Sequence, residues 1–319
     1  MLAVLGALFA NGLITILKFI AALMTGSSGM MAESLHSLAD TTNQVFLLLG
    51  LRFYKRPASE KHPFGYGKER FFWSFIAAIF IFGVGATYAI YEGIIKVREG
   101  LIGEHHLENL FWAYWILGIS FALEAGSIAL ALYQEINEAH HEGLSFGEYL
   151  RESKDPTAKT VIFEDSAALI GIVIAAAGLV LGQYHIPPYE GRLWDGIASI
   201  TIGAVLAIVA FSLARSSRGL LLGEAATKKS VEAIRAAINN HPNVKEVVEL
   251  LTMHLAPKQI LVTAHVNLKD DLNNDQIIES INEIEAEMKK AEPKVDMIFL
   301  ETARERDADV KSVMPRHIG

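Results

Sequence analysis

Long apolar runs dominate the chain up to Gly223. Six of them are close to or longer than the roughly 20 residues that a helix needs to cross a bilayer. They cover residues 1–24, 30–53, 70–95, 109–133, 160–183 and 193–214. The pattern therefore predicts an α-helical membrane domain of six transmembrane helices.

After Gly223 the chain becomes rich in charges, and its apolar residues fall into short periodic groups. Their spacing predicts two helices and three strands. In chain order these cover residues 228–240, 244–254, 259–267, 275–291 and 294–300. The order helix, strand, strand, helix, strand fits an α+β fold of the ferredoxin-like kind. We therefore expect a membrane domain over 1–223 and a cytoplasmic domain over 224–319.

Basic residues mark the expected cytoplasmic side. Residues 55–70 carry five lysines and arginines against two glutamates, and the positive-inside rule places this loop and both termini in the cytoplasm. The loop 134–158, expected to be irregular, lies on the same side. The first run contains Lys18 and is too long for a cleaved signal peptide. We expect a multi-pass protein of the cell (inner) membrane.

Composition removes several classes of protein. Of 319 residues, 51% are hydrophobic and 20% are charged, which excludes a disordered chain. The absence of cysteine excludes disulfides, thiolate metal sites and cysteine nucleophiles. A formal net charge of −8 argues against nucleic acid as a partner.

The second predicted membrane helix carries a polar stripe. Glu33, His36, Asp40 and Asn43 are spaced by three, four and three residues, so they share one helical face. A charged residue at the centre of a membrane helix costs about 2.5–3.5 kcal/mol on insertion scales, so its presence needs a reason. The stripe could be an interhelical hydrogen-bond network, but His36 and Asp40 can also face one ion. We favour the ion site.

The fifth predicted helix carries Glu164 and Asp165. Neighbouring positions on a helix point about 100° apart, so these carboxylates are not expected to share one ligand position. The alternative for Glu164 is a cytoplasm-facing carboxylate near the start of its helix, which the helix dipole would favour. Asp165 precedes a small-residue surface that lets another helix approach.

Three more charges lie within predicted membrane helices. Lys18 fits a structural counter-ion, and Glu124 is left open between a counter-ion and part of an ion path. Asp195 is expected to be an ordinary carboxylate at the beginning of the sixth helix.

Histidine with carboxylates is a ligand set for divalent metal ions. Zn²⁺ is the ion that we expect first for this ligand set, followed by Co²⁺, Fe²⁺ or Mn²⁺. No organic cofactor is expected. Because the ligands must lose their protons to bind a metal, binding is linked to proton release, which is the physical basis of an antiporter.

Several stretches resemble a known family, the cation diffusion facilitators, which are zinc transporters. The resemblance covers nearly the whole chain. It is carried by Asn11, Lys18, residues 26–29, residues 32–40, residues 62–69 (His-Pro-Phe-Gly-Tyr-Gly-Lys-Glu) and residues 221–225 (Leu-Leu-Gly-Glu-Ala).

The resemblance implies a homodimer that exports Zn²⁺ from the cytoplasm by alternating access, in exchange for protons. It also implies one ion held tetrahedrally by His36 and Asp40 of the second helix and by two ligands of the fifth. Asp165 matches one of these, but Val161 stands at the other position and cannot bind a metal. Glu164, Asn43, Glu33 or water would complete the site, unless the ion differs from zinc.

Two further metal sites of the family are incomplete. In the loop site, His62 is present, but Ser59 and Tyr66 replace an acidic residue and a second histidine. In the cytoplasmic domain, His254 and His265 lie on neighbouring strands, and the last strand has no histidine. We expect these histidines to be structural and the dimer to rest on apolar packing. The pairs at 105–106 and 140–141 are expected to be solvated loop histidines.

Two other functions compete with zinc export. Val161 favours a manganese or iron exporter on the same scaffold, and a non-transporting membrane sensor or scaffold is the rival from another class. An intramembrane metalloprotease would need His-Glu-x-x-His, which the sequence does not contain, so we do not expect an enzyme.

Overall fold

The computed structural model describes residues 2–102, 110–141, 143–152, 156–183 and 191–302. Contacts divide the chain into two compact units. The first comprises Met1–Pro57 and Glu69–Arg218, and the second comprises Ala58–Lys68 and Gly219–Gly319. The loop 58–68 therefore groups with the C-terminal unit, although it joins two helices of the first.

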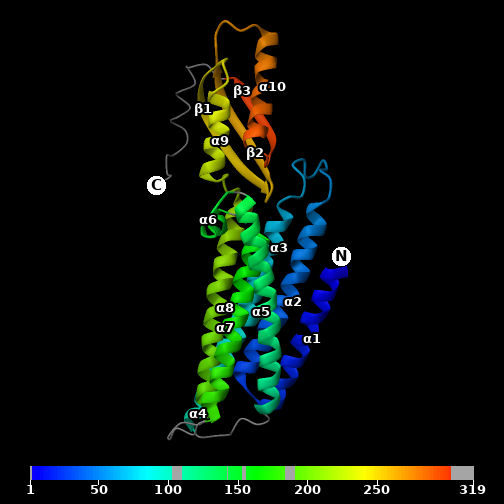
Figure 1. The fold of residues 1–319 in the computed structure, drawn as a ribbon, viewed down its shortest axis with the longest axis vertical. Helices are drawn as coiled ribbons and strands as arrows, with labels where there is room; N and C mark the ends of the chain where they lie inside the picture. Colours follow the sequence, from blue (N-terminus) through cyan, green and yellow to red (C-terminus); the bar gives the residue numbers. More distant parts are fainter. Residues whose placement is uncertain (1, 103–109, 142, 153–155, 184–190, 303–319) are drawn as a thin grey trace. The chain divides into compact units, whose positions relative to one another are not determined.

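The first unit is built from helices (Figure 1). In chain order these are α1 (Leu2–Thr25), α2 (Ser28–Tyr54), α3 (Glu69–Phe80), α4 (Thr87–Ile102), α5 (Leu110–His141), α6 (Phe146–Glu152), α7 (Pro156–Gln183) and α8 (Gly191–Leu222). The π-helical segment Ile81–Ala86 connects α3 directly to α4. Such segments occur mostly as single turns within α-helices.

Four helical segments of the described chain are long and apolar enough to cross a membrane. They are Glu69–Leu101, Leu110–His141, Thr160–Gln183 and Arg192–Leu222, and Asn11–Thr25 is a shorter apolar helix. Although α2 has 27 residues, its polar stripe makes it too polar to be recognised by hydropathy.

The expected irregular loop 134–158 is partly wrong, because α5 continues through His141 and residues 146–152 form α6. Residues 134–141 contain good helix formers and neither proline nor glycine, so nothing ends the helix where its apolar run ends. Helix α8 likewise continues to Leu222, well beyond the apolar run that ends at residue 214.

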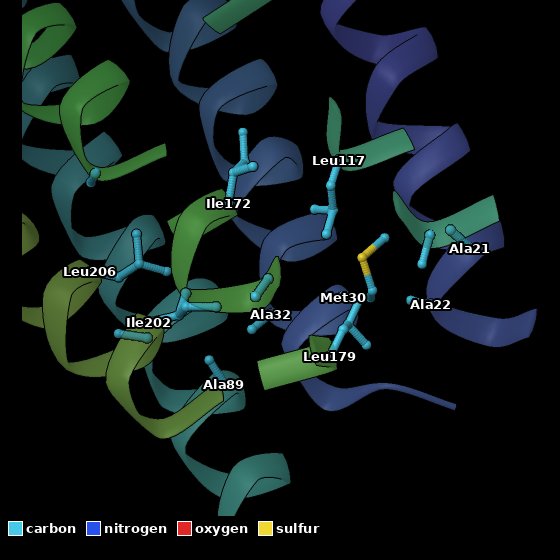
Figure 2. Close-up of a cluster of buried hydrophobic side chains, with 14 residues drawn as sticks. Ala21, Ala22, Met30, Ala32, Ala89, Leu117, Ile172, Leu179, Ile202 and Leu206 are labelled. Carbon is cyan, nitrogen blue, oxygen red and sulfur yellow. The ribbon is translucent and has the colours of Figure 1, made fainter. Parts of the chain in front are cut away.

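Small and branched apolar side chains pack the helices of the first unit together. Figure 2 shows this cluster, with Met30 of α2 drawn between Leu117 of α5 and Leu179 of α7. Ile202 and Leu206 of α8 belong to the same cluster. Helices α4 and α8 approach closely at Gly93 and Gly196, where a Cβ added to either residue would lie within 2.8 Å of the other's carbonyl oxygen.

A buried ion pair joins α1 to α2. Lys18 Nζ lies 2.9 Å from Glu33 Oε1 and donates to Ser37 Oγ at 2.7 Å, and both charged side chains are fully buried. Gly171 of α7 makes room for the pair, since a Cβ there would lie 2.6 Å from Glu33 Oε2. Lys18 is therefore the structural counter-ion that its position predicted.

The second unit contains a three-stranded sheet and two helices. Its elements are α9 (Lys228–Asn239), β1 (Val244–Ala256), β2 (Gln259–Leu268), α10 (Asn274–Ala291) and β3 (Val295–Thr302). Each begins and ends within two residues of its predicted position. The strand order is β1-β2-β3, with β2 antiparallel to β1 and parallel to β3.

Only one face of this sheet is covered by α9 and α10. Alternate residues of β2, from Ile260 to Leu268, point into the core beneath these helices. On the other face, Leu251, Thr263 and Phe299 form one row across the three strands. Leu251 is 45% exposed and Phe299 is 56% exposed, so the described structure leaves an apolar strip on this face uncovered.

We predict that the Lys18→Met variant loses about 3–5 kcal/mol of stability, because it leaves the Glu33 carboxylate buried without its counter-ion. The double variant Lys18→Met/Glu33→Leu should recover most of this loss, since it removes both charges. Thermal unfolding in detergent measures both. Equal losses in the single and double variants would show that the ion pair itself does not set the stability.

Candidate functional site

A cavity of about 110 Å³ lies between α1, α2, α5 and α7. Four carboxylate residues contribute to its wall. They are Asp40 of α2, Glu124 of α5, and Glu164 and Asp165 of α7. Asn11, Ser37, Asn43, Gln44 and Ser127 add uncharged polar groups, and the remaining wall is apolar. Four acidic residues around one small cavity inside a helical bundle require a positively charged occupant or protons.

The α2 side of the site consists of His36 and Asp40. His36 Nε2 lies 3.5 Å from Asp40 Oδ2, close enough for electrostatic attraction. Within the described part of the chain, neither ring nitrogen of His36 nor Asp40 Oδ1 has a hydrogen-bond partner. Asp40 lines the cavity, whereas His36 is buried behind it and does not form part of the wall.

On the α7 side, Glu164 faces α2. Asn43 Nδ2 donates to Glu164 Oε2 at 2.5 Å, and Glu164 is only 5% exposed. The interpretation of Glu164 as a carboxylate at the start of its helix is therefore wrong, because α7 begins eight residues earlier, at Pro156. Among the described residues, Asn43 Oδ1 and Glu164 Oε1 have no hydrogen-bond partner.

Asp165 has a different partner from its neighbour. Its Oδ2 accepts a hydrogen bond from Ser127 Oγ of α5 at 2.9 Å. Glu164 and Asp165 thus approach the cavity from different directions, as expected from adjacent helical positions. Ser127 was not predicted as a site residue, although a serine one turn after Glu124 in an apolar helix was a signal.

Val161 occupies the wall of the cavity one turn before Asp165. The position where the family resemblance implies a fourth ligand therefore does face the cavity, but with an apolar side chain. Glu33, considered as a substitute, is instead paired with Lys18. Glu124 of α5, whose role the sequence left open, lines the same cavity.

Across the described ranges, no three histidine or carboxylate side chains converge closely enough to hold a metal ion in this structure. Candidate metal ligands therefore surround the cavity, but they do not form a coordination shell in this structure. The unpartnered oxygens of Asp40, Asn43 and Glu164 could turn toward an ion, because each already borders the cavity or its edge.

The remaining histidines lie elsewhere. In the loop, the rings of His62 and Tyr66 are 4.6 Å apart, and Ser59 Oγ lies 3.2 Å from Tyr66 Oη. His254 is buried, with its backbone N–H donating to Glu224 O at 3.0 Å. His140 and His141 end α5 rather than lying in a loop, and the pair 105–106 lies outside the described residues.

His265 lies between two carboxylates on the uncovered face of the sheet. Its Nδ1 is 3.5 Å from Glu249 Oε2 and its Nε2 is 3.1 Å from Glu301 Oε2. The three residues are in register on β1, β2 and β3. The two ring nitrogens thus face different carboxylates, an arrangement that fits the structural role expected for this histidine.

Comparison with known proteins identifies the family. Residues 4–222 match the family described as the cation efflux transmembrane domain, and residues 226–300 match the cation efflux protein, cytoplasmic domain. The chain belongs to the cation efflux family. The predicted resemblance to the cation diffusion facilitators is thereby confirmed, and the chain is a multi-pass membrane protein of a transporter family rather than an enzyme.

The proteins that this chain resembles include one named as a zinc antiporter. The chain is 29% identical to the mitochondrial proton-coupled zinc antiporter SLC30A9 of Homo sapiens over 99% of its own length and 57% of the human protein. It is 32% identical to metal tolerance protein C4 of Arabidopsis thaliana over 87% of its length and 58% of that protein. It is 23% identical to magnetosome protein MamM of Paramagnetospirillum magneticum over 76% of its length and 69% of MamM. The chain therefore spans little more than half the length of the first two.

We predict that Val161→His raises zinc affinity by about tenfold or more, because it adds a nitrogen ligand on the cavity face of Asp165. Isothermal titration of the purified protein with Zn²⁺ measures the change. The matched variant Val161→Leu keeps the wall apolar and should bind zinc like the parent. Equal affinity in all three proteins would contradict the placement of this position at the ion.

Proposed function

We propose that this chain exports divalent metal cations from the cytoplasm in exchange for protons, with Zn²⁺ as its first cargo. The family, the cavity and the naming of relatives as a zinc antiporter and a metal tolerance protein support the proposal. His36, Asp40 and Asp165 are the proposed central ligands, and Glu164 and Asn43 are proposed to complete the shell when their side chains turn inward.

The observation that carries this proposal is the set of unsatisfied polar atoms around the cavity. A buried carboxylate oxygen without a hydrogen bond is costly in a low-dielectric interior, whereas a divalent cation or a proton would offset that cost. In the described structure such atoms occur on both α2 and α7, at Asp40, Asn43 and Glu164. An ion between the two helices would satisfy both sides.

The cavity borders the second half of α2, whereas the first half of α2 packs into the apolar cluster. Gln44, Leu47 and Val161 line the cavity toward the C-terminal end of α2, whereas Met30, Ala32 and their neighbours pack tightly toward its N-terminal end (Figure 2). Such a one-sided arrangement suits a transporter that exposes its site to one compartment at a time. The basic loop 55–70 supports assigning the end that holds the cavity to the cytoplasm.

Proton coupling follows from the chemistry of the ligands. Carboxylates and imidazole bind a metal ion only after they lose their protons, so protons and metal compete for the same atoms. Protons that arrive at Asp40 or His36 from the outer side would release the ion there. After the metal leaves, a site that stayed deprotonated would carry buried negative charge without a counter-ion. Protons must therefore bind before the site turns back to the cytoplasm, and this requirement couples the proton flux to the metal flux.

A harder ion is the alternative cargo, and a specific observation favours it. Oxygen atoms predominate among the polar groups of the cavity wall, and the imidazole of His36 is not part of that wall. A site built mainly from carboxylate and amide oxygens suits Mn²⁺ and Fe²⁺ better than a site with two histidines does. Co²⁺ is a further possible cargo. A non-transporting sensor or scaffold is distinguished from all of these because it would carry no ion.

The membrane topology, the domain limits and the location of the chain are also proposals. We propose six membrane spans, formed by α1, α2, the continuous α3–α4 helix, α5, α7 and α8, with both chain ends in the cytoplasm. We divide the chain into a transport domain over 1–223 and a ferredoxin-like domain over 224–319. We propose the cell membrane as its location; the word mitochondrial in the human relative's name describes that protein.

We further propose that the cytoplasmic domain forms a homodimer through its uncovered sheet face. The strip of Leu251 and Phe299 is apolar and flanked by the charged row of Glu249, His265 and Glu301. An apolar patch bordered by polar residues is typical of a protein interface. A second copy of the same strip would cover it symmetrically.

Transport in proteoliposomes tests the proposed function. With a metal-sensitive dye inside and an imposed pH gradient, we predict uptake of Zn²⁺ that falls by at least about tenfold in Asp40→Ala and Asp165→Ala, because each variant removes a ligand. Asp296→Ala, an exposed carboxylate on β3, should transport like the parent. Parallel runs with Mn²⁺, Fe²⁺ and Co²⁺ rank the cargo. No flux with any ion would identify a scaffold instead.

The dimer surface makes a separate prediction. Phe299→Glu should convert a dimer into a monomer, because it places a charge within the apolar strip. Ile278→Glu is the matched control, since Ile278 is 59% exposed on α10, away from the sheet face. Light scattering coupled to size-exclusion chromatography measures the mass. A dimer that persists in Phe299→Glu would place the interface elsewhere.

A further inference from the structure

Asp195 is a buried carboxylate whose partners lie on another helix. It lies in the first turns of α8 and is fully buried. It accepts four hydrogen bonds: from Ser27 Oγ, from Ser28 N at 2.5 Å, from Ser28 Oγ at 2.8 Å and from Gly29 N at 3.1 Å. All four donors belong to three consecutive residues at the beginning of α2, so the expectation of an ordinary carboxylate that serves its own helix is wrong.

These contacts cap α2 with a charge from α8. The first N–H groups of a helix have no partner within it, and negative charge is favourable at this end. Ser27 accepts from Met30 N at 3.0 Å, while Asp195 accepts from the two N–H groups between them. Gly29 permits the approach, because a Cβ there would lie 3.1 Å from Asp195 Oδ1 and 3.7 Å from Ala175 Cα.

The connection lies at the closed end of the bundle. Asp40 follows Ser28 by twelve residues, about 18 Å along a helix axis. Between them, Met30 and Ala32 of α2 pack into the apolar cluster of α5, α7 and α8 (Figure 2). The cavity begins beyond this cluster, at Ser37 and Asp40. An ion that leaves toward the N-terminal end of α2 must therefore pass a region that Asp195 helps to hold together.

We propose that Asp195 is a positioning residue that latches the N-terminal end of α2 to α8 and keeps the cargo cavity closed at that end. The proposal rests on the proposed transport function. Opening toward the other compartment requires α2 and α8 to separate here, and the four hydrogen bonds set part of the free-energy difference between the two states. Charge-assisted hydrogen bonds in a buried site suit this role, since they are strong when formed and wholly lost on separation.

Because the chain contains no cysteine, one introduced cysteine is the only thiol that a labelling reagent can modify. Ala32→Cys places one thiol in the packed cluster, where the parent residue is 1% exposed. In proteoliposomes, the rate at which a membrane-impermeant maleimide labels this cysteine measures how often the cysteine becomes accessible to water. We expect Asp195→Asn to raise the labelling rate by about tenfold, because the amide cannot accept all the hydrogen bonds that hold the closed state.

Ser199→Ala is the matched control. Ser199 lies one turn further along α8, is fully buried and donates a hydrogen bond to Ala89 O of α4 at 2.8 Å rather than to α2. It should leave the labelling rate unchanged. Ser28→Ala removes one donor without altering the charge and should raise labelling by a smaller factor, which provides the test if Asp195→Asn does not fold.

Three outcomes would overturn the latch. These are unchanged labelling in folded Asp195→Asn, unchanged labelling in Ser28→Ala when Asp195→Asn does not fold, and an equal rise in Ser199→Ala. A rise in Asp195→Asn or Ser28→Ala alone supports it. Metal flux is measured separately in the Ala32→Cys parent. Absence of flux there counts against the proposed function, whereas the labelling comparison by itself decides the latch.

Discussion

A polar group buried among membrane helices must be satisfied by another group, and this constraint organises the whole first unit. Lys18 satisfies it through Glu33 Oε1 and Ser37 Oγ, and Asp195 satisfies it with four donors from the start of α2. Among the described residues, Glu33 Oε2 and oxygens of Asp40 and Glu164 have no hydrogen-bond partner. The Lys18 and Asp195 contacts hold helices together, whereas Asp40 and Glu164 line the cavity.

This division gives α2 two different halves. Its first half is fixed by the Asp195 contacts, the Lys18 pair and a cluster of small side chains. Its second half borders the cavity through Asp40 and Asn43. A movement that changes access to the site must therefore break specific polar contacts at one end of α2 while the other end closes, which is the physical requirement of alternating access.

The fold could be predicted from sequence to a large extent because its signals are local. Apolar length located the long helices of the first unit other than their extensions, and residue periodicity placed α9, α10 and the three strands within two residues. The helix spacing also put Asp40 and Asn43 on one face. The extension of α5 was missed because its last turns are polar yet contain no helix breaker.

The partners of the site residues could not be predicted, because they depend on which helix faces which. Spacing along α2 could not show that Glu33 pairs with Lys18, or that His36 lies behind Asp40. Nothing local to α8 indicated that Asp195 caps α2, and the role of Ser127 beside Asp165 appears only when α5 and α7 are brought together. The candidate ligands were thus found as residue types, but their pairing required the structure.

The central claim is that the incompletely satisfied oxygens around the cavity exist to hold the cargo ion. A zinc-bound structure, with the ion located by its anomalous scattering, tests this most directly. The account predicts density between α2 and α7, with oxygen atoms of both Asp40 and Asp165 within about 2.0–2.2 Å of the ion. Zinc found elsewhere in the chain, with these two carboxylates turned away from each other, would contradict it.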